Sequence, residues 1–398
     1  MRFSTILVLL LLLPATASAE LWCASPLWVH EWGVQAFDAS GAPQNPASMP
    51  GWFHRDGSSG PSSGPATRDL PADSGIRALP VLHFYSAGSL SSPISVGVEV
   101  GFRHGDARRW YPAVNTRRPA SEANSARAAR GRTELLRRRG APIPIAGGAD
   151  QPAVPSDPTR QLIWDRLLLT SEPQHAAHAS HTPWVDALRD FDAMWVNTPR
   201  ESERFVFYEA GTSERVALTL SRGQTWRPDH RHLIVRNTSS HDVHDIFFTR
   251  REGRDVYVFF APSIPAGRSA GFVIEEHRVA ASQLTAETRG RLRRRLIDSA
   301  QPAAPTNYRM DANDCVMARD PAAPVERSDG HRLYAQEVDA MLDVWAPSFF
   351  DASGTTISYR EDTAYLDREM PLAIYTDKFN FVRLRRMGLA VWSHVPLP

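Results

Sequence analysis

The 398-residue sequence has almost no lysine, almost no cysteine and a formal net charge of only +1. Lys378 is the only lysine, so arginine supplies nearly all of the 45 basic residues, a bias that we attribute to coding composition rather than to function. The 44 acidic residues balance them, so no global positive field favours nucleic acid and no excess of acid indicates disorder. No nucleic-acid partner is therefore expected.

Long apolar runs and several catalytic signatures are also missing. No stretch approaches the ~18 uninterrupted apolar residues of a transmembrane helix, so we expect no transmembrane segment. The chain contains no SxxK, no P-loop and no dinucleotide fingerprint, and neither cysteine has CxxC spacing. These absences favour a binding protein over the enzymes that carry those motifs.

The N-terminus has the three parts of a secretory signal. Arg2 supplies the positive start, Ile6–Leu13 the apolar run, and Ala17–Ala19 the small-x-small cleavage pattern before Glu20. As a helix, the apolar run would reach only about 12 Å, far short of a bilayer core of ~30 Å. We therefore predict a cleaved signal peptide over residues 1–19 and an exported, soluble protein, either periplasmic or extracellular.

Export permits disulfides, and the chain has two cysteines, Cys23 and Cys315. A bridge between them would close nearly the whole chain, for which the loop-entropy model gives an upper limit of about 5–6 kcal/mol. Lipid attachment at Cys23 is disfavoured because Trp22 is bulkier than the residue that precedes a lipidated cysteine. We predict a Cys23–Cys315 disulfide, with two separate thiols as the alternative.

Short segments with β-type patterns dominate the mature region. Ile94–Phe102 alternates apolar and small or polar residues, and Asp245–Thr249 with Asp255–Phe260 has the pattern of a hairpin. Helices are predicted over Thr285–Asp298 and Leu333–Trp345, the second from its 3.6-residue apolar stripe. The fold class that follows is mainly β, β-sandwich-like, with a helical pair inserted before the C-terminal strands. Further strands are predicted over Trp28–Phe37, Leu79–Tyr85, Leu162–Leu169, Arg204–Tyr208, Arg215–Leu220, His232–Arg236, Thr355–Arg360, Pro371–Tyr375 and Phe379–Trp392.

Composition divides the chain into four regions. The signal covers 1–19, and a β-rich region over 20–170 carries long Gly/Ser/Pro-rich and Arg-rich loops. A β-sandwich-like region follows over 171–280, and the helical pair with the C-terminal strands occupies 281–398.

Several phrases, in this order along the chain, resemble an uncharacterised family of secreted bacterial proteins whose mature region begins with a VHEWG motif. The resemblance implies export and supports the fold class, but it brings no activity. Val34 stands where the family usually has threonine, and residues 298–330 resemble an insertion. The matching phrases are Val29–Gly33 (VHEWG), Pro80–Ser86 (PVLHFYS), Trp110–Pro112 (WYP), Arg204–Gly211 (RFVFYEAG), Leu333–Trp345 (LYAQEVDAMLDVW) and Pro371–Ile374 (PLAI).

The motif residues are the first candidates for chemistry. A zinc-binding HExxH helix is excluded, because its second histidine would stand at Val34. In a strand, His30 and Glu31 point to opposite faces, whereas His83 and Tyr85 share one. We name His30, Glu31, His83 and Tyr85 as candidate catalytic residues. The alternative is a hydrogen-bonded histidine in an aromatic core, with Glu31 paired to an arginine.

His175, His178 and His181 follow HxxHxxH spacing. On a helix they would spread over about 120° of one face, and imidazole binds divalent transition metals. They are the metal candidates, and a divalent metal is the only cofactor suggested. The alternative is a solvated loop, because Pro173 and Pro183 bracket the segment.

Arginines 289, 291, 293, 294 and 295 concentrate on one predicted helix. A solvated face is the favoured interpretation, with an anionic polysaccharide, lipid head groups or an acidic protein surface as the alternatives. Together, the sequence favours an extracytoplasmic binding or scaffolding protein whose partner is a protein or polysaccharide. The alternative function is a metal-dependent or histidine-based hydrolase that acts on a sugar or anionic substrate.

Overall fold

The computed structural model describes most of the chain after residue 26. The described residues are 27–44, 50–55, 75–77, 80–86, 93–103, 107–114, 161–212, 214–224, 230–280, 284–297, 332–351, 353–376 and 382–398. The predicted signal peptide over 1–19, both Cys23 and Cys315, and residues 115–139 of the Arg-rich loop lie outside them. The disulfide and the signal therefore stay predictions.

A large twelve-stranded sheet forms the middle of the molecule, with β1 (Leu27–Phe37) near its centre. β1 runs parallel to β20 (Val382–Trp392) over its whole length and antiparallel to β5 (Val81–Ser86). The sheet continues beyond β20 through β18 (Gly354–Glu361), and beyond β5 through β11 (Val206–Thr212). Its other strands are β14 (Val243–Glu252), β15 (Asp255–Ile264), β17 (Arg278–Val279), β7 (Ala107–Tyr111), β3 (His54–Arg55), β2 (Pro43–Gln44) and β4 (Gly75–Arg77).

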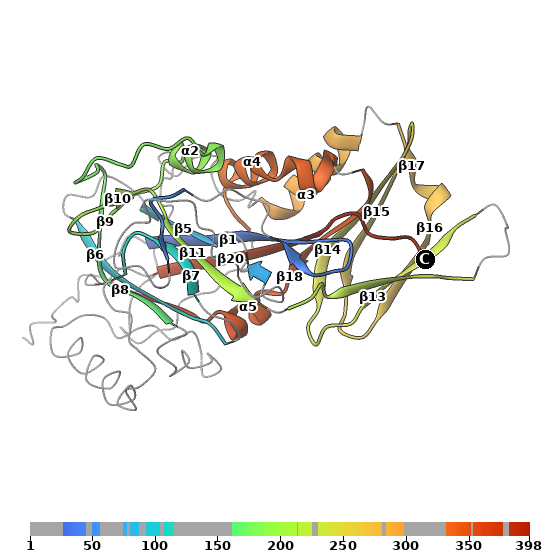
Figure 1. The fold of residues 1–398 in the computed structure, drawn as a ribbon, viewed down its shortest axis with the longest axis horizontal. Coiled ribbons are helices and arrows are strands. Elements are labelled where there is room, and N and C mark those ends of the chain that lie inside the picture. Colours follow the sequence, from blue (N-terminus) through green and yellow to red (C-terminus); the bar gives the residue numbers. More distant parts are fainter. Residues whose placement is uncertain are drawn as a thin grey trace, which may run out of the picture.

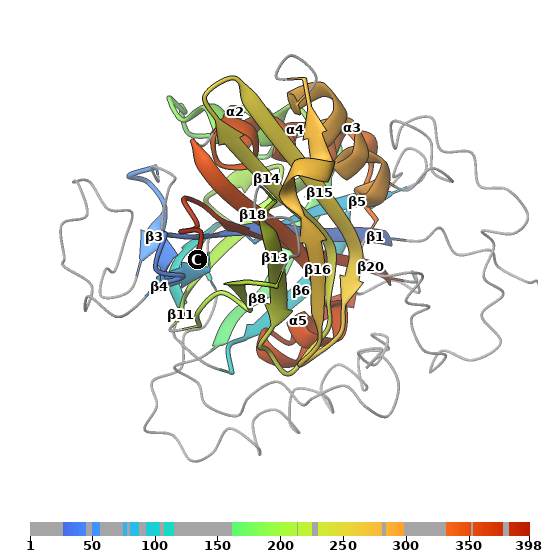
Figure 2. The ribbon, with the colours of Figure 1, turned by 90° about the vertical axis from the view of Figure 1, so that its right-hand side faces the viewer.

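Two smaller antiparallel sheets account for the other strands among the described residues. One has five strands in the order β10 (Ser202–Glu203), β9 (Trp195–Asn197), β8 (Gln161–Thr170), β6 (Ile94–Gly101) and β19 (Leu372–Thr376). The other has three strands in the order β12 (Leu218–Arg222), β13 (His232–Asn237) and β16 (Ser269–Val273). They lie toward opposite ends of the large sheet in Figure 1, and Figure 2 views the molecule from the end that carries β13 and β16.

Helices lie on both sides of the large sheet. In Figure 1, α2 (Pro183–Arg189), α4 (Ala335–Val344) and α3 (Leu284–Leu296) follow one another along one side, whereas α5 (Thr363–Glu369) lies on the opposite side. Short helical segments η2 (Ile274–His277) and η5 (Pro347–Asp351) complete the set. No helix in the described ranges is long and apolar enough to cross a membrane.

The alternation of side chains in β1 explains these layers, because successive residues of a strand point to opposite faces. Trp28 and Trp32 pack with apolar residues of α2 and α4 in one core cluster. Leu27 and Val29 pack on the five-stranded sheet, and Phe37 packs on the three-stranded sheet. One strand therefore contributes to all three major cores.

The predicted mainly β, sandwich-like fold is confirmed, and so is the helical pair before the C-terminal strands. The predicted hairpin is present with a shorter turn, because β14 continues to Glu252 and Gly253 takes a positive φ of 58°. The regions divided at 170 and 280 share one sheet, since β1 pairs with β20 and β14 of the middle region pairs with β18. Two short helices, α2 and α5, were not predicted.

Candidate functional site

The VHEWG segment lies in β1 at the middle of the large sheet. His30 pairs with His83 on β5 and with Arg385 on β20, and Glu31 pairs with Arg386. The two motif side chains therefore point into different layers, as strand alternation predicts. They define two polar clusters on opposite faces of the same strand.

The first cluster, here called the His30 cluster, lies between β1, β5 and α4. It comprises His30, His83, Tyr85, Tyr334 and Glu337, all buried. His30 Nδ1 lies 2.6 Å from Glu337 Oε2, which also accepts a hydrogen bond of 3.0 Å from the backbone N–H of Tyr334. His83 Nδ1 lies 3.8 Å from Glu337 Oε1. The Glu337 carboxylate of α4 thus lies close to histidines from two strands, β1 and β5.

Burial sets the charge state of this cluster. It lowers the pKa of His83 to about 4, although Glu337 opposes the shift, so this imidazole is neutral near pH 7. Burial would raise the pKa of Glu337, but its contacts with His30 outweigh that and lower it. Burial, reinforced by Glu337, also raises the pKa of Tyr85 well above its ordinary value.

Only some of the polar atoms in the His30 cluster have hydrogen-bond partners among the described residues. Among the described residues, His30 Nε2, both ring nitrogens of His83 and Glu337 Oε1 have no hydrogen-bond partner. Aromatic rings take the place of polar partners: His30 lies 4.5 Å from Tyr334 and His83 4.8 Å from Phe191, measured between ring centroids. Such unpaired buried groups cost stability.

The second cluster, here called the Glu31 cluster, lies on the opposite face and comprises Glu31, Tyr208, Asp367 and Arg386. The guanidinium of Arg386 donates two bonds to Glu31, of which the Nη2–Oε1 bond is 3.0 Å, and an Nη1 bond of 2.9 Å to Asp367 on α5. The Tyr208 hydroxyl donates to the same Glu31 carboxylate. Burial opposes the positive charge of Arg386, but Glu31 outweighs it and the arginine pKa is raised. The cluster is a saturated, buried ion network.

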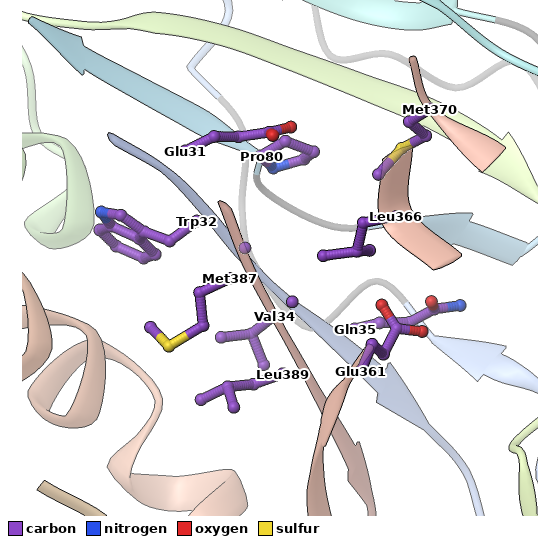
Figure 3. A pocket seen from close by; sticks show the side chains of 12 residues that line it. Glu31, Trp32, Val34, Gln35, Pro80, Glu361, Leu366, Met370, Met387 and Leu389 are labelled. Carbon is purple, nitrogen blue, oxygen red and sulfur yellow. The ribbon is translucent and has the colours of Figure 1, made fainter. Parts of the chain in front are cut away.

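A small cavity adjoins the Glu31 cluster where Gly33 and Gly388 stand opposite each other in register. Its volume is about 30 Å³, room for about two water molecules. Figure 3 shows Gln35 and Glu361 near Leu366 of α5, whereas Glu31 lies farther along the strand beside Pro80. The cavity is too small for a sugar.

The three metal candidates do not form the arrangement that was predicted. Residues 171–182 are irregular, so the helix required to align the imidazoles is absent. His178 stacks on Trp52 with centroids 5.0 Å apart, the backbone of His175 donates to Ser202 Oγ at 2.8 Å, and His181 is exposed. Within the described ranges, no group of three His, Cys, Asp or Glu side chains is placed to hold a metal ion. Pro183 stands in the first turn of α2, so the histidine segment is an irregular connection that ends where this helix begins.

The arginine-rich helix is α3, and most of its arginines form ion pairs. Arg289 pairs with Asp343, and Arg293 binds Asp339 with contacts of 2.6 and 2.8 Å, both on α4. Arg295 donates to the buried carboxylate of Asp245 at 2.7 Å. These ion pairs attach α3 to α4 and β14, and they reduce the positive charge on α3 that is available to a partner.

Of the four candidate catalytic residues, the structure brings His30, His83 and Tyr85 together and places Glu31 on the opposite face. Sequence reasoning missed Glu337, Arg386, Asp367 and Tyr208. One signal existed for Glu337, because it interrupts the apolar stripe of its helix beside Val338 and faces the core. No such signal marked Arg386, whose strand mixes arginine and apolar residues on both faces.

No family model matches this chain, and no curated protein matches it.

Proposed function

We propose that this chain is an exported β-rich protein that acts outside the cytoplasm as a binding or scaffolding protein for a protein or polysaccharide partner. The signal-like N-terminus and the resemblance to secreted proteins with a VHEWG motif support the location. The layered β architecture supports a scaffolding role. The disulfide between Cys23 and Cys315 belongs to the same proposal, since an oxidising compartment would permit it.

One observation carries the non-catalytic role: the motif side chains fasten separate layers to the central strand. His30 holds Glu337 of α4, and Glu31 holds Arg386, which in turn holds Asp367 of α5. All of these side chains are buried. Buried side chains that hold one another in this way stabilise the fold. The surface that binds a partner would then lie elsewhere on the molecule.

Fractionation of cells that express the full chain tests the location. We expect the mature protein in the periplasm or medium, with Glu20 as its N-terminal residue. Full-length protein that stays in the cytoplasm would refute export.

Binding of the purified mature protein to a panel of defined extracytoplasmic polymers, including purified peptidoglycan, tests the role. We expect saturable binding that Glu337→Gln leaves intact below its own unfolding temperature. Soluble product released from a polymer, with release abolished by His30→Gln, would overturn the binding role in favour of catalysis.

The histidine-based hydrolase remains a second candidate because of one contact. Glu337 holds His30 Nδ1 at 2.6 Å, while His30 Nε2 has no partner among the described residues. A carboxylate that orients an imidazole in this way is the arrangement by which histidine acts as a general base. Turnover of model esters or glycosides that requires His30 and follows the ionisation of an imidazole would support it, and inactivity of the folded parent protein toward such substrates would count against it.

A further inference from the structure

We infer that the side chains gathered around Tyr111, the tyrosine of the WYP phrase, form a binding site for a neutral saccharide chain. This site rests on the binding role proposed for the protein and would be the surface that performs it. The group, here called the Tyr111 site, comprises Trp52, His54, Tyr111, His178, Arg189, Glu201 and Glu203.

Tyr111 lies at the base of the site. Its side chain is fully buried, and its ring lies 4.5 Å from that of Trp52 and 6.0 Å from those of His54 and His178, measured between centroids. The Arg189 guanidinium lies 5.7 Å from the Trp52 ring, which also stacks on His178. Side chains from β3, β7, α2 and the connection before α2 therefore converge, and Figure 1 shows α2 and β10 at the same end of the molecule.

The polar groups of the site are fixed by one another but remain within reach of solvent. His54 Nε2 lies 2.7 Å from Glu201 Oε1, and Glu201 Oε2 accepts a bond of 2.7 Å from the backbone N–H of Ala113. Arg189 donates bonds of 3.1 and 2.7 Å to the Glu203 carboxylate. The side chains of His54, Glu201 and Arg189 are 13%, 8% and 17% exposed, so a ligand reaches them without any opening of the core.

Several donors and acceptors of the site are available to a ligand. Among the described residues, His54 Nδ1 and both ring nitrogens of His178 have no hydrogen-bond partner. The Glu201 carboxylate uses only two of its roughly four acceptor positions. Sugar hydroxyls both donate and accept, so they match a set that contains imidazole nitrogens and a carboxylate.

The charge of the site favours a neutral ligand. Burial would raise the pKa of Glu201, but the hydrogen bonds from His54 and the backbone of Ala113 outweigh it and lower that pKa, so the carboxylate is ionised near pH 7. Together, Glu201 and Glu203 repel an anionic polymer, whereas Arg189 weakens the attraction for a cationic one. Hydroxyl groups carry no charge and incur neither penalty.

Trp52 and His178 supply the apolar contact. Both rings are half-buried and stacked on each other, so their exposed edges form a small aromatic surface beside the polar groups. A pyranose ring presents C–H groups as well as hydroxyls and therefore suits such a mixed surface. A protein partner would require a larger apolar interface core than one half-buried indole provides.

Isothermal titration of the mature protein with chitohexaose, cellohexaose and maltohexaose tests the site, with hexagalacturonate as the anionic comparison. We expect at least one neutral hexasaccharide to bind and hexagalacturonate not to bind. Trp52→Ala and His54→Ala should each weaken the binding about tenfold or more, because each removes a central contact. His244→Ala is the matched control, since His244 also lies beside a carboxylate, 3.3 Å from Asp362, but belongs to β14 toward the other end of the large sheet.

Three results would overturn the Tyr111 site: no binding of any neutral hexasaccharide, tighter binding of hexagalacturonate, or equal affinities in the parent protein and His54→Ala. Retention of the parent protein on peptidoglycan despite such a result would leave the proposed binding role intact and place its surface elsewhere. Retention on no polymer, together with no hexasaccharide binding, would reject both the site and the role.

A second measurement uses the parent protein alone and does not depend on how the variants fold. Diethyl pyrocarbonate modifies accessible imidazoles, and mass spectrometry locates each modified histidine. A bound hexasaccharide should slow the modification of His54 and His178 and leave the exposed His394 and the partly exposed His244 unchanged. Equal protection of all four histidines, or no protection of His54 and His178, would contradict binding at this site.

Discussion

The two faces of β1 each carry a buried polar cluster that attaches a helix to the strand, but the clusters differ in how completely their polar atoms are paired. Both attach a helix to the central strand through a buried carboxylate, Glu337 of α4 on one face and Asp367 of α5 on the other. The Glu31 cluster surrounds a guanidinium with two carboxylates, so each of its charged groups has a hydrogen-bonded partner of opposite charge. The His30 cluster leaves four ring and carboxylate atoms without partners among the described residues.

This difference separates groups with a fixed structural role from groups whose charge can respond to pH. A saturated ion network loses much when one member is removed, because the others stay buried and charged. The His30 cluster instead contains His83, whose pKa is lowered by burial, so that protonation of this imidazole at low pH changes the stability of the fold. We therefore assign fixed attachment to the Glu31 face and pH sensitivity to the His30 face.

The largest effect is expected at Arg386. Arg386→Met would leave Glu31 and Asp367 buried without their counter-ion, and we expect the free energy of unfolding to fall by about 3–5 kcal/mol in urea titrations. Arg278→Met is the control, because its ion pair with Asp255 is largely exposed and should change stability by less than about 1 kcal/mol. Similar losses in both variants would remove the distinction between buried and surface pairs.

The pH dependence at His83 ranks second. Its folded-state pKa of about 4 lies below the ordinary value of 6.5, so the unfolded chain takes up the proton first as the pH falls. The stabilising contribution is complete above pH 6.5 and declines toward pH 4, by an amount on the order of 3 kcal/mol.

A comparison of two variants isolates this contribution. Unfolding free energies measured from pH 6.5 to 4.5 should show a shallower decline for His83→Phe than for the parent protein. His181→Phe is the control, since that side chain is exposed and its replacement should leave the slope unchanged. An unchanged slope in His83→Phe would show that His83 does not titrate in this window.

Glu337→Gln should have a smaller effect. The amide keeps the shape of the side chain but removes the charge from its 2.6 Å contact with His30, and a hydrogen bond to a charged group contributes about 1.5–3 kcal/mol. We expect a loss in that range from chemical denaturation, with the transition remaining cooperative. A gain in stability would mean that burial of the charge costs more than the contact returns.

The smallest effect is expected on α3. Arg291 pairs with Glu287 one helical turn away, and both side chains are partly exposed. Arg291→Ala should change the free energy of unfolding by about 0.5 kcal/mol or less, and added salt should reduce that further. A loss above about 1 kcal/mol would show that the arginine-rich face has a structural role beyond a solvated surface.

The periodic parts of the fold were predictable from sequence. The alternation in Ile94–Phe102 corresponds to β6, and the apolar stripe of Leu333–Trp345 corresponds to α4. The parallel pairing of β1 with β20 was not predictable, because it joins residues about 350 positions apart and no local pattern encodes it. Helix α5 was missed because it is short and follows directly after a strand.

Only part of the candidate site was predictable from sequence, again because contacts between distant segments leave no local pattern. Strand alternation alone placed His30 and Glu31 on opposite faces and His83 with Tyr85 on one. Their partners come from distant segments, Glu337 from α4 and Arg386 from β20, so only the tertiary structure identifies them. At His175–His181 the spacing suggested a metal site, but the irregular backbone does not align the imidazoles.

Hydrogen exchange in two variants tests most directly whether each motif residue fastens its own layer. We predict that Glu337→Gln increases exchange in α4 and leaves α5 protected, whereas Asp367→Asn increases exchange in α5 and leaves α4 protected. Equal increases in both helices in either variant, or no increase in the helix that carries the substitution, would contradict the account of two independent attachments on opposite faces of one strand.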